Sequence, residues 1–281
     1  MKNDPKIIMY NIKKRKNDFM FWLIGTLLVL TIFIFLCAKE ISALHTISSI
    51  VKTLSFLVIF LKVINYQNCS GLSRNSLICF FIALLCRIFV YTFFSIRLRT
   101  FKINELNSIF NKIAEYFTFL IICFLLYCFY CKYPETSDIN YDNEIPYYYL
   151  SISAFICAIP FKPWVFRNWF IDLIWIYSIF LESVSIYPQI ILFYKKKGCI
   201  ENFTSHFLIL QGISSILGLI YWINSYFMFN DRKSLLLGEY SGYLIIVSEI
   251  IKLIIVAYYL YLYLKSLFNK MNTMNHKKYD I

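Results

Sequence analysis

The sequence is short of charged residues, of histidine, and of glycine and proline. Only 16% of its 281 residues are charged, and it has three histidines, seven glycines and six prolines. A typical soluble domain carries about 25% charged residues, so this shortage argues against an ordinary water-soluble fold. No histidine–carboxylate–nucleophile set and no metal-ligand spacing is present, so we expect neither an enzyme nor a metal or other cofactor.

What the chain has in abundance is apolar sequence. Hydrophobic residues make up 59% of it, and the mean hydropathy is +0.62. Runs such as residues 19–38 and 243–264 carry few charges and are long enough to cross a hydrocarbon core of about 30 Å as helices. They are continuous rather than alternating, which excludes the strand pattern of a barrel. The sequence therefore predicts an all-α integral membrane protein.

We predict eight membrane-spanning helices, of which the fifth is short. They cover residues 18–38, 45–64, 77–96, 108–131, 147–161, 171–194, 206–228 and 242–264.

The distribution of basic residues predicts the orientation. Residues 13–16, directly before the first span, are all basic, which places the N-terminus in the cytosol. Residues 195–197 and the C-terminal tail are also basic and fall on the same side, whereas Arg97 and Arg99 fall on the other and count against it. The net charge of +12 is thus explained by span flanks in contact with anionic lipid, and we expect no nucleic-acid partner.

Ionisable residues inside the spans are candidates for function because each costs a few kcal/mol to insert. They are His45, Lys52, Lys62, Arg87, Asp172, Glu182, Glu249 and Lys252. Lys62 lies near a span end, where its head can reach water. Glu249 and Lys252 are three residues apart on one helix face, and we expect them to pair with each other.

Lys52, Arg87 and Glu182 lie deeper in their spans. Two interpretations stay open for these residues: a functional site, or a buried ion network that serves the structure.

Four stretches resemble one known family. They are FLKVINYQNCSGLSRNS (residues 60–76), IDLIWIYSIFLESVSIYPQIILF (171–193), ENFTSHFL (201–208) and YYLYLYLKSL (258–267). Together they resemble the ER lumen protein-retaining receptors, or KDEL receptors, which are seven-helix relatives of SWEET and PQ-loop transporters.

The resemblance implies the domain organisation. Residues 45–268 correspond to the seven-helix, SWEET/PQ-loop-like bundle, and residues 269–281 to a cytosolic tail. Residues 1–44 fall outside the family pattern and would form a basic cytosolic N-terminus and one additional N-terminal transmembrane helix. Such a helix would deliver residue 45 to the lumen, where the family's first helix begins, so the resemblance and the charge pattern agree.

The resemblance also implies a site. Arg87 matches the family's helix-2 arginine, which helps to hold the carboxylate of the cargo peptide, and a guanidinium suits that bidentate contact. Trp222 matches a tryptophan that lines the pocket, and Glu182 a glutamate of the proton-linked rearrangement. His45 falls on a helix-1 arginine and Lys52 on a pH-sensing histidine. These five residues are the candidates for ligand binding (Arg87, Trp222, His45, Lys52) and for proton coupling or a buried ion network (Glu182, Lys52, His45).

Other positions depart from the family. Ser214 and Ser215 replace a Tyr-Arg pair, Ser225 replaces an arginine, Val90 an aspartate of the helix-2 motif and Ala257 the helix-7 aspartate. Most of the cations that grip an acidic tetrapeptide are thereby lost, which argues against a standard KDEL or HDEL tail as the ligand.

We therefore expect a divergent receptor that binds the C-terminal retrieval tetrapeptide of ER-resident proteins, or a related ligand, in a central polar cavity. It would serve pH-dependent Golgi-to-ER retrieval in ER and Golgi membranes. Lys277 and Lys278 lie near a position for binding coat proteins, although orientation alone also explains a basic tail. Two alternatives stay open: a PQ-loop/SWEET-type transporter of small solutes, and a scaffold derived from the receptor that binds no ligand.

Overall fold

The computed structural model describes residues 42–94, 105–136, 138, 142, 145–163, 168–195, 202–226 and 240–279. The predicted first span, residues 18–38, lies outside them. Within the described residues every regular element is a helix, which confirms the all-α prediction.

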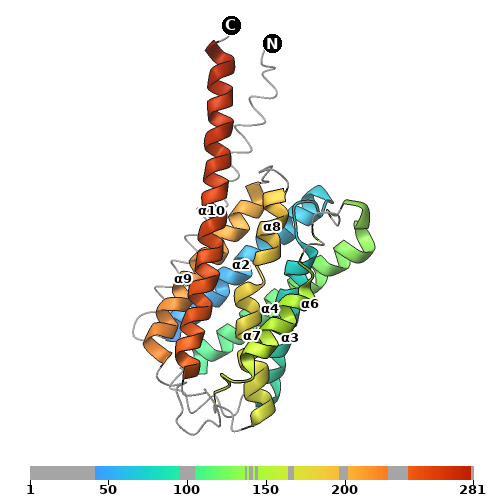
Figure 1. Ribbon diagram of the computed structural model, residues 1–281. Coiled ribbons are helices and arrows are strands. Elements are labelled where there is room, and N and C mark those ends of the chain that lie inside the picture. Colours follow the sequence, from blue (N-terminus) through green and yellow to red (C-terminus); the bar gives the residue numbers. More distant parts are fainter. Residues whose placement is uncertain are drawn as a thin grey trace.

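The helices follow the predicted spans closely. They are α2 (Ser42–Tyr66), α3 (Arg74–Phe94), α4 (Glu105–Tyr127), α6 (Tyr147–Ala158), α7 (Trp169–Val184), α8 (Tyr187–Lys195), α9 (Asn202–Ser225) and α10 (Ser241–Tyr279). A π-helical turn, Cys128–Lys132, continues α4. With α7 and α8 counted as one span, 6 helices of the described chain are long and apolar enough to cross a membrane, and α6 is a shorter apolar helix. The last turns of α10 extend beyond the other helices (Figure 1).

The six long spans pack as a closed ring. Following the contacts around it, the order is α2, α4, α3, α7, α10, α9 and back to α2, with α8 as the continuation of α7. The short helix α6 packs against α3 and α7 (Figure 1). Helices that are neighbours in the ring are therefore not always neighbours in sequence, and α4 and α10 lie on opposite sides.

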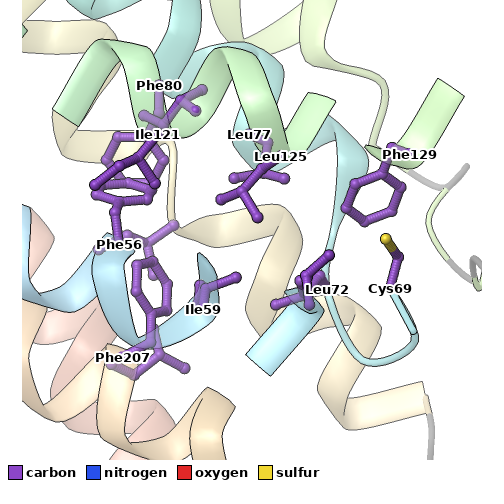
Figure 2. Close-up of a cluster of buried hydrophobic side chains, with 14 of the residues drawn as sticks. Phe56, Ile59, Cys69, Leu72, Leu77, Phe80, Ile121, Leu125, Phe129 and Phe207 are labelled. Atoms are coloured by element: carbon purple, nitrogen blue, oxygen red, sulfur yellow. The ribbon is translucent and has the colours of Figure 1, made fainter. Parts of the chain in front are cut away.

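An apolar cluster fills one half of the ring (Figure 2). Phe56 of α2 is fully buried and meets Phe80 of α3 and Phe207 of α9 edge-on, with ring centroids 5.0 and 5.2 Å apart. Ile121 of α4 and Tyr259 of α10 belong to the same cluster. Phe56 and Ile121 lie in the C-terminal halves of α2 and α4, toward the end that the charge pattern predicts to face the cytosol. The cavity described below lies toward the other end.

A buried carboxylate holds the start of α3 at the closed end. Asp142 accepts hydrogen bonds from the hydroxyl of Ser73 at 2.5 Å and from the backbone N–H of Asn75 at 3.1 Å. Ser73 in turn accepts the backbone N–H of Ser76 at 3.1 Å, so free donors of the first helical turn are satisfied. Burial raises the pKa of Asp142 above its ordinary value, while these hydrogen bonds oppose the rise.

Candidate functional site

A polar cavity lies inside the ring, in the half that the apolar cluster leaves open. It is lined by residues of all six ring helices. Its lining includes His45 near the start of α2, Asn107 near the start of α4, Trp175 near the start of α7 and Trp222 near the end of α9. These helix ends are the ones that the charge pattern predicts to be lumenal.

Five charged side chains from five ring helices form one network below the cavity. On one side, Glu115 of α4 uses a single oxygen, Oε1, to accept from Lys52 Nζ of α2 at 3.0 Å and from Arg87 Nη1 of α3 at 2.9 Å. Both helices neighbour α4 in the ring, so this carboxylate ties three adjacent helices together.

Glu182 of α7 is the centre of the network. Its Oε2 accepts from Arg87 Nη2 at 2.6 Å, and its Oε1 accepts from Lys52 Nζ at 3.3 Å and from Lys252 Nζ of α10 at 3.1 Å. All five side chains are buried, with no residue more than 8% exposed. At such burial a charge is tolerated only when it is paired, so the three cations and two carboxylates depend on one another.

The structure thus brings together Lys52, Arg87 and Glu182, the three deep residues that sequence reasoning singled out. Sequence reasoning overlooked Glu115. This glutamate lies inside the predicted span 108–131, where the rule on ionisable residues in spans applies to it as well. The predicted pair of Glu249 and Lys252 is wrong, because Lys252 is turned to Glu182 and Glu249 Oε2 has no hydrogen-bond partner.

Aromatic rings border the cavity above the network. The imidazole of His45 stacks on Tyr221 with centroids 4.7 Å apart and meets Trp222 edge-on at 5.8 Å. Trp175 of α7 faces Trp222 at 6.3 Å. His45 Nδ1 is buried and has no hydrogen-bond partner. The predicted residues His45 and Trp222 therefore share one aromatic wall, contributed mainly by α2 and α9.

Small residues explain how closely α9 approaches α2. Ser48 donates to the backbone oxygen of Ser214 at 2.7 Å, and Ser214 donates back to that of Ser48 at 2.8 Å. A Cβ atom at Gly218, one turn further, would lie 3.3 Å from Ser48 Oγ. The small side chain of Ser214 thus allows a close contact between α2 and α9.

Two charged residues of the lining stay outside the network. Lys112 of α4 and Glu249 of α10 both border the cavity. Glu249 Oε2 has no hydrogen-bond partner, although Lys252 of the network acts on this carboxylate electrostatically. The described part of the chain also holds no group of three His, Cys, Asp or Glu that could bind a metal.

Comparisons with known proteins give one consistent result. The family model described as "ER lumen protein retaining receptor" matches residues 68–225. The ER lumen protein-retaining receptor of Dictyostelium discoideum is 26% identical over 220 residues, which cover 75% of this chain and 88% of that protein. The receptor of Plasmodium falciparum is 28% identical over 202 residues, 71% of this chain and 84% of its own. The mouse ER lumen protein-retaining receptor 3 is 26% identical over 182 residues, 62% and 73%.

Proposed function

This chain belongs to the ER lumen protein-retaining receptor family, and on that premise we propose that it binds the C-terminal end of lumenal proteins in the cavity inside the ring. The binding would serve retrieval from the Golgi to the ER, with the basic tail in the cytosol, where coat proteins could reach it. The observation that carries the proposal is a polar cavity lined by six helices, at the end of the bundle that the charge pattern predicts to be lumenal.

The cavity has a wall suited to a carboxylate. Lys52, Lys112 and Arg87 line it from α2, α4 and α3, which are consecutive in the ring. Two of these cations are already paired with Glu115 and Glu182. Lys112 therefore supplies the charge that a peptide's terminal carboxylate would neutralise, while Arg87 and Lys52 hold the floor in position. A charge-assisted hydrogen bond of this kind is about twice as strong as a neutral one.

His45, in the aromatic wall of the cavity, would give carboxylate binding a response to pH. His45 is the histidine of the described lining, and a carboxylate bound nearby would favour its charged form. By linkage, protons then favour carboxylate binding to the same extent. We therefore expect carboxylate ligands to bind more tightly at acidic than at neutral pH.

The test is a binding assay on the purified full chain in detergent micelles. Fluorescent peptides that copy the last residues of ER-resident lumenal proteins are titrated at about pH 5.5 and about pH 7.5. Peptides with a free carboxylate should bind at least about tenfold more tightly than their C-terminal amides. Lys112→Met should erase this difference, whereas Lys132→Met, at an exposed lysine of the π-helical turn that follows α4, should not. Equal binding of acids and amides, or no binding of any tail at either pH, would overturn the proposal.

A further inference from the structure

The side of α2 that faces away from the cavity carries an apolar cluster of its own, here called the satellite cluster. Its buried members come from α2 and α9: Ile47, Val51, Val58 and Leu210. The α2 members lie about half a turn around the helix from Ser49 and Lys52, which line the cavity. Leu54 and Leu217 pack against the cluster but are only partly buried, so its apolar surface continues outward between α2 and α9.

Isoleucines form the exposed face of α9 next to this cluster. Ile213, Ile216, Ile220 and Ile223 follow one another at intervals of three and four residues, and each is 41% to 50% exposed. That spacing places them in one stripe along the helix. A β-branched side chain has one strongly preferred rotamer in a helix, so this stripe loses little entropy when a second helix covers it. The exposed face of α4, on the other side of α2, instead carries aromatic rings, among them Phe117.

The predicted first span, residues 18–38, is a segment that can reach this surface. Only residues 39–41 separate it from Ser42, the first residue of α2. The four Cα–Cα steps from residue 38 to residue 42 cover at most about 14 Å, and packed helices lie about 8–10 Å apart. The span is therefore confined to the surroundings of α2, whose ring neighbours are α4 and α9. The outer side of α7, across the ring, is out of its reach.

The sequence of the span contains a face that fits the isoleucine stripe. Residues without rings or charges recur in it at intervals of three and four: Met20, Ile24, Leu27, Thr31, Ile34 and Ala38. In the predicted orientation the span and α9 both run from the cytosol to the lumen, so the two stripes would meet as parallel seams. Small side chains such as those of Thr31 and Ala38 permit the close approach by which helices associate in lipid.

We propose that the predicted first span packs on the outward side of α2 and against the isoleucine stripe of α9, where it covers the satellite cluster. The contact joins the two helices that carry the aromatic wall of the cavity, since His45 of α2 stacks on Tyr221 of α9 at 4.7 Å. The span is thus an intramolecular brace behind that wall. This role is independent of which ligand, if any, the cavity takes.

Photo-cross-linking of the full chain in its membrane tests the proposal. The photoreactive residue p-benzoylphenylalanine is incorporated in place of Ile213 or Ile220 on α9. The controls carry it in place of Ile113 on α4 or Ile254 on α10, which are also exposed. Both α9 positions should form adducts within residues 18–38 of the same chain, and position 220 should label nearer to residue 38 than position 213 does, because the helices are parallel. The controls should label lipid.

A matched pair of variants in the span gives a second readout. Ile34→Trp places a bulky ring in the proposed contact, so it should lower both the adduct yield and the melting temperature. Ile32→Trp, two residues away and on the opposite side of the predicted helix, should lower neither.

Several results would overturn the proposal. Adducts between two copies, recognised by mixing isotopically light and heavy chains, would make the α9 face an interface between molecules. Adducts to lipid alone from both α9 positions would leave that face to the bilayer, and adducts from Ile113 to residues 18–38 would place the span on α4. Equal effects of the two tryptophans would likewise contradict the proposed face.

Discussion

At the scale of single residues, the centre of the molecule is a network of five buried charges, three positive and two negative, joined by ion pairs. Glu182 contacts three cations, whereas Lys252 contacts one carboxylate. Removing one partner from a buried ion pair costs about 3–5 kcal/mol, because the other charge is left without compensation. The number of partners that a residue holds should therefore set the cost of losing it.

Glu182→Gln is expected to lower the free energy of unfolding by about 4 kcal/mol, since Lys252 loses its carboxylate and Lys52 and Arg87 keep only Glu115. Lys252→Met should cost about 2 kcal/mol, because Glu182 retains two cations. Thermal unfolding in detergent, followed by tryptophan fluorescence, measures both. The exposed Glu135→Gln serves as the control and should leave the melting temperature unchanged. A Lys252→Met protein that melts at or below the temperature of Glu182→Gln would contradict this picture of the network.

At the scale of elements, the break between α7 and α8 is a joint that fixes the closed end of the ring. Pro188 has no backbone N–H, and the N–H of Gln189 bonds to the oxygen of Ile186 at 3.1 Å instead of continuing the helix. The oxygen of Ser185, left free, accepts the hydroxyl of Ser76 at 2.6 Å. The interruption is thereby compensated by α3 rather than by the helix itself.

The side chain of Gln189 connects this joint to the loop between α2 and α3. It donates to the backbone oxygen of Gly71 at 2.8 Å and accepts the backbone N–H of Ser73 at 2.7 Å. Gly71 has φ of 76°, a conformation that favours glycine, so the loop can present both groups to one side chain.

Gln189→Ala should lower the free energy of unfolding by about 2–3 kcal/mol, because two buried backbone groups lose their partners. Gln189→Glu keeps the acceptor for Ser73 but loses the donor to Gly71, so we expect an intermediate loss. Hydrogen exchange of residues 68–73, measured by mass spectrometry beside the melting temperature, should rise in the same order. Unchanged exchange in the alanine variant would show that the loop holds its shape without this contact.

At the scale of the whole molecule, the sequence predicts the helices far better than the way they meet. Span positions follow from about 20 apolar residues in a row, so the prediction of 108–131 lies close to the observed span Asn107–Lys132. Spacing along one helix reports only neighbours on that helix, and for this reason Glu249 and Lys252 were expected to pair. The actual partner of Lys252 comes from α7, 70 residues away, and depends on the order of the ring.

The same limit applies to the cavity. Glu115 could have been found from the sequence, because an ionisable residue in an apolar span is conspicuous. That Lys112 and Glu249 line the same cavity could not, since it requires knowing the order in which α4 and α10 take their places in the ring. Arg87, Glu182 and Trp222 lie within the part of the chain that the family model matches. Lys52 and Lys252, which complete the network, lie outside it.

The central claim is that a peptide end is bound inside this ring, and photo-cross-linking tests it most directly. A peptide with a free carboxylate and a photoreactive last residue is bound to the purified chain and irradiated, and the adducts are mapped by mass spectrometry. The account predicts adducts on the cavity-lining part of α4, between Asn107 and Lys112, that an excess of unlabelled peptide suppresses. Adducts on α6 or on the C-terminal tail, or adducts that competitor peptide does not suppress, would contradict it.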